Sequence, residues 1–248
     1  MTFAPQKMCD NLAKVRERME LAASRCGRRA EKITLIAVSK TQSVQKIREL
    51  YEAGVRHFGE NRVQERESKL AQLADFNATW HMIGHLQKNK VSRAARLFAS
   101  IDSLDSISLA EKLDRARADC AADAAGNSEL PETGNRLRVL IEVKLDPEPA
   151  KSGVPAVDVV RLAEAILRLP HLDLHGVMGV PPYFDNPEEA RPYFRRMREL
   201  RDQVRAQLGS EMLPVLSMGM SNDFEIAIEE GATEVRVGTA LFGEREKA

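Results

Sequence analysis

The sequence predicts an α/β fold, a single closed barrel of eight parallel strands that alternate with helices. Short apolar runs, which suit strands, alternate with amphipathic segments, which suit helices, and strands recur eight times. The chain has 248 residues, and about 250 residues is typical of a (β/α)₈ barrel. We therefore expect residues 1–248 to form one domain. An open, doubly wound sheet is the alternative, because periodicity does not show whether a sheet closes.

The first elements illustrate both patterns. Apolar residues at three- and four-residue spacing predict a helix over residues 7–26. Residues 33–38 (ITLIAV) form a continuous apolar run that is too short for a helix and is typical of a strand buried on both faces. The next predicted helix, 44–53, stops at Gly54, a glycine signal for a helix end.

The same alternation continues to the end of the chain. The other predicted strands are 55–58, 79–83, 98–101, 137–143, 172–177, 215–218 and 234–237. The other predicted helices are 62–73, 88–96, 106–121, 156–169, 187–208 and 223–230. Residues 119–135 break the rhythm with four acidic residues, no lysine or arginine, and several turn residues. We expect an exposed acidic loop there.

The charge balance excludes some classes of function. The chain has 37 Lys+Arg and 37 Asp+Glu, so its net charge is zero, which argues against a main role in binding nucleic acid or an anionic membrane. The arginines of 187–208 are interleaved with acids, which favours a solvated helix face. Without a signal peptide, a long apolar segment or paired cysteine motifs, we expect a cytoplasmic protein, and we expect it to be a monomer.

In a parallel barrel, ligands bind at the carboxyl ends of the strands. Lys40 directly follows the first apolar run, so a dry barrel wall would surround its stem. Desolvation disfavours the ammonium form and lowers the pKa of a lysine, which makes it a nucleophile for Schiff-base chemistry. The alternative is a lysine that reaches from the strand end into solvent.

Two glycine-containing segments suggest a phosphate site. Ser217–Ser221 (SMGMS) precedes a predicted helix, and Val237–Thr239 (VGT) ends the last strand. Glycines let backbone N–H groups approach a ligand, and a phosphate site after strands seven and eight recurs in this architecture. The alternative is ordinary turn and cap chemistry, with Ser221 as a helix N-cap.

The two histidines of HMIGH, His81 and His85, are spaced as metal ligands on a helix would be. Here the first lies in a predicted strand and the second lies beyond it. They would not share a helical face, so we expect no metal site.

Several strings resemble one known family, in the family's order and along nearly the whole chain. They are AVSKT (37–41), FGENRVQE (58–65), WHMIGHLQKNK (80–90), KSG (151–153), LSMGMS (216–221) and VRVGT (235–239). Together they resemble the pyridoxal phosphate homeostasis proteins, which are similar to the N-terminal domain of alanine racemase.

The resemblance implies a (β/α)₈ TIM barrel of the alanine racemase type, the type III fold of pyridoxal phosphate (PLP) proteins. It implies that Lys40 forms an aldimine with pyridoxal 5′-phosphate and that Arg236 faces the pyridine nitrogen. Asn61 would lie near the cofactor. Lys144 departs from the family, which usually has asparagine there, and leaves the polar side of the pocket open to question.

The resemblance further implies a phosphate site formed by Ser217, Ser221, Gly238 and Thr239. His85 and Met218 would line the pocket. The implied function is to hold the cofactor and to maintain the vitamin B6 and amino-acid balance of the cell. Apo-enzymes that need the cofactor are the candidate protein partners.

An amino-acid racemase is the alternative function. A racemase of this fold needs an acid or base on each face of the bound substrate, and one is a tyrosine from a second domain. Only about nine residues follow Thr239, and Tyr183 is the one tyrosine after a predicted strand end. An arginine does not yield its proton to the pyridine nitrogen, which makes the ring a weak electron sink. We therefore expect a carrier without strong turnover, rather than an enzyme.

Overall fold

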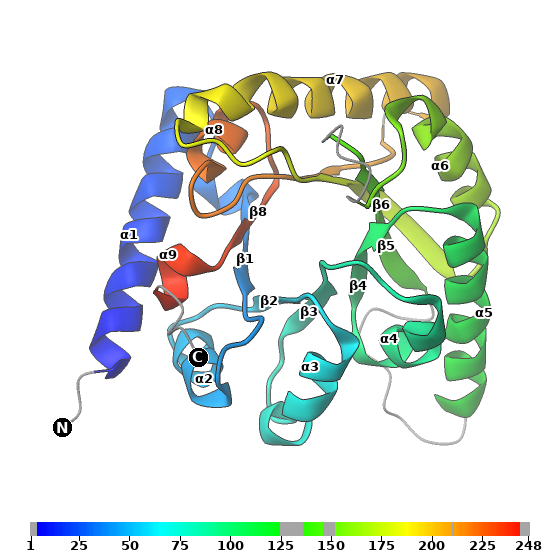
Figure 1. The fold of residues 1–248 in the computed structure, drawn as a ribbon, viewed down its shortest axis with the longest axis horizontal. Helices are drawn as coiled ribbons and strands as arrows, with labels where there is room; N and C mark the ends of the chain where they lie inside the picture. Colours follow the sequence, from blue (N-terminus) through cyan, green and yellow to red (C-terminus); the bar gives the residue numbers. More distant parts are fainter. Residues whose placement is uncertain (1–3, 125–135, 146–151, 210, 244–248) are drawn as a thin grey trace.

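The computed structural model describes residues 4–124, 136–145, 152–209 and 211–243. In this part of the chain, eight strands form one closed barrel in which all neighbours are parallel and β8 pairs with β1 (Figure 1). The predicted (β/α)₈ barrel is confirmed, and the open sheet is excluded.

The strands alternate with helices throughout. The strands are β1 (Thr34–Val38), β2 (His57–Glu60), β3 (Thr79–Met82), β4 (Ser100–Leu104), β5 (Leu137–Val143), β6 (Leu172–Gly179), β7 (Val215–Ser217) and β8 (Glu234–Val237). The α-helices are α1 (Ala4–Arg25), α2 (Val44–Glu52), α3 (Val63–Lys69), α4 (Val91–Leu97), α5 (Ile107–Ala124), α6 (Val159–Leu167), α7 (Arg191–Leu208), α8 (Phe224–Glu229) and α9 (Thr239–Phe242). Short 3₁₀ turns are η1 (Ala30–Lys32), η2 (Ala71–Leu73), η3 (Lys88–Lys90), η4 (Ala156–Asp158) and η5 (Pro187–Ala190).

Two strands are displaced toward the C-terminus by comparison with the sequence prediction. β2 and β4 start two residues after the predicted 55–58 and 98–101 and run on through polar residues. Glu60, which ends β2, and Asp102, in the middle of β4, are both completely buried. Apolar periodicity does not reveal a strand whose buried face carries charge, and that is why these strand ends were missed.

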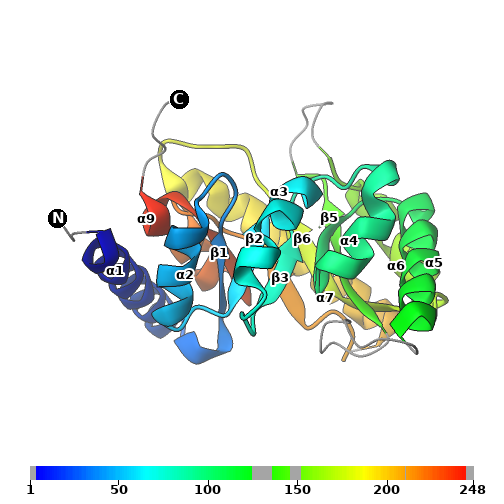
Figure 2. The ribbon, with the colours of Figure 1, turned by 90° about the horizontal axis from the view of Figure 1, so that it is seen from below.

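The helices surround the barrel and bury its outer face. Ile47 of α2 and Phe194 of α7 are among the completely buried side chains of this layer. The first and last helices pack together: α1 lies against α8 and α9 (Figure 1), Arg18 pairs with Glu225 at 2.7 Å, and Asn11 donates to the Leu241 carbonyl. Figure 2 shows α1 beside α2 on the same side of the barrel.

Three arginines of α7 pair with one acidic residue at the end of α8. Glu230, at the end of α8, lies within 3.3 Å of guanidinium groups from Arg191, Arg195 and Arg198. Burial acts to raise the pKa of Glu230, but hydrogen bonds from Arg195 and Arg191 outweigh it and hold that pKa below its usual value. These arginines therefore bind α7 to α8, the helix that follows β7.

The end of α5 differs from the prediction. The helix continues beyond the predicted end at Ala121 to Ala124, because alanines favour helix. The rest of the predicted acidic loop, residues 125–135, lies outside the described residues. None of the helices in the described part of the chain combines the length and the apolar character that spanning a bilayer requires.

Candidate functional site

Lys40 lies just beyond β1, beside the last strand of the barrel. In the β1–β8 pair, Ile36 is in register with Arg236 and Ala37 with Val237. Side chains alternate along a strand, so Val38 shares the inward face of Ile36, and Lys40 follows two residues later. Lys40 is half-buried at the mouth of the barrel.

Two backbone N–H groups converge on a single oxygen next to this strand end. The amides of Gly238 and Ala240 each donate to the Ser221 hydroxyl oxygen over 3.2 Å. Backbone donors that converge in this way also suit an anionic oxygen. Gly219 is required nearby, because its φ is +91° and a Cβ atom there would lie 2.5 Å from the Cβ of Ala227.

Arg236 lies inside the barrel below this mouth and is 3% exposed. Its guanidinium donates to the Ser217 hydroxyl at 2.8 Å and to the Gly179 carbonyl at 3.0 Å. Burial lowers the pKa of Arg236, and the nearby Asp102 and Glu234 carboxylates oppose that shift. An arginine stays protonated under such conditions, so a fixed positive charge underlies the site.

A layer of charged and polar side chains, most of them buried, lies further down the barrel. Arg138 of β5 pairs with Glu234 of β8, and these strands are not neighbours, so the pair must cross the barrel interior. On β3 and β4, His81 Nδ1 lies 2.9 Å from Asp102 Oδ2. His81 Nε2 lies 3.1 Å from Nδ1 of His57, whose pKa is lowered to about 4 by burial and by the neighbouring His81 and Arg138. This layer, which we call the ionic layer, replaces the branched aliphatic side chains usual in such barrels.

The ionic layer contains the one group of potential metal ligands found among the described residues, namely His81, Asp102 and Glu234. Each of the three already has a partner: His81 and Asp102 hold each other, and Glu234 accepts from Arg138. His85 is not part of this group, because its side chain is 57% exposed beyond the strand. The two histidines of HMIGH therefore lie apart, one buried inside the barrel and the other exposed beyond the strand.

Glu142 of β5 is a further carboxyl near Arg236, and its side chain is half-buried. Its Oε2 atom is buried and has no hydrogen-bond partner in the described part of the chain. Burial, and then the nearby Asp105, raise the pKa of Glu142 to about 7, while Arg236 acts in the opposite direction. Sequence reasoning overlooked Glu142, although positions 138 and 142 place two charged residues on one face of a largely apolar strand.

Glu142→Gln should stabilise the protein at alkaline pH. With a folded-state pKa near 7 and an ordinary value of 4.5, the folded state holds the proton more tightly than the unfolded state. The free energy of unfolding of the wild type therefore falls as the pH rises from 4.5, the ordinary pKa, through about 7, the folded-state pKa. We expect the variant to exceed wild type by about 2 kcal/mol at pH 8 and to match it near pH 4. Denaturant unfolding at both pH values checks this, and equal stability at pH 8 would contradict it.

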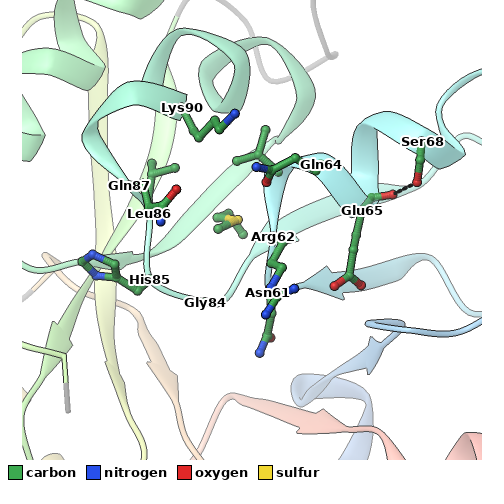
Figure 3. Close-up of a pocket in the computed structure, with 12 residues that line it drawn as sticks. Asn61, Arg62, Gln64, Glu65, Ser68, Gly84, His85, Leu86, Gln87 and Lys90 are labelled. Carbon is green, nitrogen blue, oxygen red and sulfur yellow. Dashed lines mark hydrogen bonds between the residues drawn. The ribbon is translucent and has the colours of Figure 1, made fainter. Parts of the chain in front are cut away.

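A cavity of about 730 Å³ opens between the β2–α3 and β3–α4 connections (Figure 3). Two predicted site residues, Asn61 and His85, line it, together with Glu65 of α3 and Lys90. The two connections approach closely at Gly84, where a Cβ atom would lie 2.5 Å from the Asn61 carbonyl oxygen. Figure 3 shows His85 directed to the opposite side from Asn61.

The other predicted residues lie on β7, β8 and their connections. Ser217 uses its hydroxyl to hold Arg236, while Met218 is completely buried in the hydrophobic core. Thr239 is exposed at the start of α9. The structure thus gathers Ser221, Gly238 and Thr239 at the mouth, and it places Ser217 and Met218 deeper.

The fold and the site define a class. Residues 11–246 match the family described as "Alanine racemase, N-terminal domain". The chain also resembles the alanine racemase of Clostridium difficile 630, with a TM-score of 0.71 and 14% identity over 98% of this chain and 58% of that one. At that identity the likeness concerns the fold alone.

Closer relatives narrow the class to one family. The pyridoxal phosphate homeostasis protein of Aquifex aeolicus is 44% identical over 237 residues, which cover 96% of this chain and 98% of that protein. Its counterpart in Pseudomonas aeruginosa is 41% identical over 239 residues and 96% of each. PipY of Synechococcus elongatus PCC7942, solved with PLP bound, has a TM-score of 0.79 and 35% identity over 95% of this chain and 100% of that one. This chain belongs to the pyridoxal phosphate homeostasis protein family.

Proposed function

We propose that this chain binds pyridoxal 5′-phosphate at the mouth of the barrel and holds it as an aldimine to Lys40, without strong turnover. One observation carries the proposal: the adjoining strands β8 and β1 bring a lysine, a buried arginine and converging backbone N–H groups to one end of the barrel. An amine, a partner for the ring nitrogen and an anion site are what this cofactor requires.

Each group has a task in binding. The amides of Gly238 and Ala240 bind a phosphate oxygen, and the hydroxyls of Ser221 and Thr239 complete that site. Arg236, held rigidly by Ser217 and Gly179, presents its positive charge to the pyridine nitrogen. Lys40 would supply the amine that condenses with the aldehyde of the cofactor, and the aldehyde oxygen would leave as water with the two amine hydrogens.

The position of Arg236 favours holding the cofactor over reacting with it. A guanidinium keeps its proton, so a pyridine nitrogen that faces Arg236 stays unprotonated and the ring withdraws electrons weakly. The relatives are named as homeostasis proteins, which supports a carrier or regulator role. Asn61, His85 and Met218 as pocket residues, apo-enzymes as partners, a monomeric state and a cytoplasmic location stay predictions.

Titration of the purified protein with pyridoxal phosphate tests the proposal. We expect a visible absorption band that saturates at one cofactor per chain, while incubation with L-alanine yields little D-alanine. A protein that remains colourless at saturating cofactor would contradict binding through an aldimine. Rapid formation of D-alanine would instead establish the racemase alternative.

A further inference from the structure

The two residues that flank Lys40 are both anchored by charged side chains from α3. On one side, the Thr41 backbone N–H donates to Glu65 Oε2 over 2.8 Å. On the other side, Lys69 Nζ donates to the Ser39 carbonyl oxygen over 2.9 Å. Residues four apart on a helix lie on the same face, so a single face of α3 holds the chain immediately before and immediately after Lys40.

Thr41 needs such an anchor because of its backbone. Its φ is +61°, in the left-handed region that β-branched residues rarely adopt. A strained conformation persists only where its surroundings hold it. The Glu65 carboxylate supplies a charge-assisted hydrogen bond, the stronger kind, at the strained residue itself.

The anchor on the other side is buried. The Lys69 ammonium also contacts Glu60 Oε1 at 2.7 Å, and the Ser39 hydroxyl donates to the same oxygen at 2.7 Å. Glu60 and Ser39 are completely buried. Ser39 is thus held at both its carbonyl and its hydroxyl, in surroundings where water does not compete for the hydrogen bonds.

We propose that α3 acts as a clamp, with Glu65 and Lys69 as positioning residues that aim the Lys40 amine into the barrel mouth. This inference rests on the proposed function, because it concerns the covalent link between Lys40 and the cofactor. Because Ser39 and Thr41 are already fixed, only the side-chain torsions of Lys40 lose freedom when the covalent link forms. Without the clamp, the backbone around Lys40 must also be ordered, and the link becomes weaker.

Glu65→Ala tests the clamp, with Glu67→Ala as the matched control. Glu67 lies on the same helix but pairs with Arg93 at 3.1 Å and has no hydrogen bond to the segment around Lys40 in the described residues. We expect Glu65→Ala to raise the pyridoxal phosphate concentration that half-saturates the visible band by about tenfold, a typical loss for a charge-assisted hydrogen bond. Glu67→Ala and Glu65→Gln, whose amide oxygen still accepts, should stay within about threefold of wild type.

A suppressor tests whether Glu65 acts through Thr41. Asparagine tolerates the left-handed region better than threonine does, so Thr41→Asn in the Glu65→Ala background should recover at least about threefold of the lost affinity. If Thr41→Asn recovers none of the lost affinity, the inference that Glu65 acts through the Thr41 backbone is overturned. Borohydride reduction measures the fraction of Lys40 linked to the cofactor, and thermal unfolding shows that each variant folds. If Glu65→Ala does not fold, Glu65→Leu keeps the helix propensity and carries the same expectation.

These experiments distinguish a failure of the clamp proposal from a failure of the proposed function. A wild-type protein that binds the cofactor at Lys40, together with a Glu65→Ala variant that behaves like Glu67→Ala, would overturn the clamp and leave the proposed function standing. A wild-type protein without any link to Lys40 would overturn both.

Discussion

Lys40→Ala should lose the visible absorption band and the covalent link while it keeps the fold. The alanine side chain offers no amine to the cofactor aldehyde, so binding would depend on the phosphate contacts of Ser221, Gly238 and Ala240. We expect the apparent affinity for pyridoxal phosphate to fall by about a hundredfold or more, roughly 2.7 kcal/mol. Spectroscopic titration measures the loss of the absorption band, and equilibrium dialysis measures the loss of affinity.

Lys144→Ala is the matched control for this prediction. Lys144 follows β5 and, like Lys40, is a half-buried lysine just beyond the end of a barrel strand. Its removal should leave the band in place and change the affinity by less than about tenfold. A band that survives in Lys40→Ala and disappears in Lys144→Ala would mean that the site has been assigned to the wrong lysine.

Arg236→Leu should cause the largest loss of stability of any single change considered. Arg236 is buried, holds Ser217 and Gly179, and lies close to several carboxylates, including Asp102 and Glu234. Removing one charge from a buried network leaves its partners uncompensated, which typically costs about 3–5 kcal/mol. The loss should be greater at pH 8 than at pH 5, because the carboxylates left behind can take up protons at the lower pH.

Arg195→Leu provides the comparison. Arg195 pairs with Glu230, but its side chain is 54% exposed, and exposed ion pairs contribute at most about 1 kcal/mol. Denaturant unfolding of Arg236→Leu and Arg195→Leu at pH 8 and pH 5 measures the loss of stability in each variant. Similar small losses for Arg236→Leu and Arg195→Leu would contradict the structural role given to the buried arginine.

Most of the fold could be predicted from the sequence because the barrel strands and the helices around them show the usual hydrophobic patterns of buried strands and amphipathic helices. Runs such as residues 33–38 are apolar where a strand is covered by helices, and Gly54 marks a helix end as expected. Lys40 could be singled out for the same reason, since it directly follows such a run. Ser221, Gly238 and Thr239, which follow the ends of two strands, lie together because β7 and β8 are neighbouring parallel strands.

The ionic layer could not be predicted, because its members pair across the barrel. Arg138 and Glu234 are 96 residues apart in the sequence, and no local pattern shows that two charged residues on non-adjacent strands will meet. The same limit explains the displaced bounds of β2 and β4. The available signal was the pair of charged residues, Arg138 and Glu142, on one face of β5, and it does not indicate their partners.

The roles of Glu65 and Lys69 in the clamp could not be predicted from the sequence either. Glu65 and Lys69 have the spacing of an ordinary exposed helical pair, and α3 was predicted only as part of a longer helix over 62–73. Their role becomes visible once the helix is placed against the segment that follows β1, because both hydrogen bonds go to the backbone and to residues next to Lys40.

Borohydride reduction of the cofactor-loaded protein, followed by peptide mass analysis, tests whether Lys40 holds the cofactor covalently. Reduction converts a C=N link into a stable C–N bond, so the labelled residue can be identified. We expect one reduced cofactor per chain as the label, attached to Lys40. A label on another lysine, or a protein that binds the cofactor and carries no label after reduction, would contradict it.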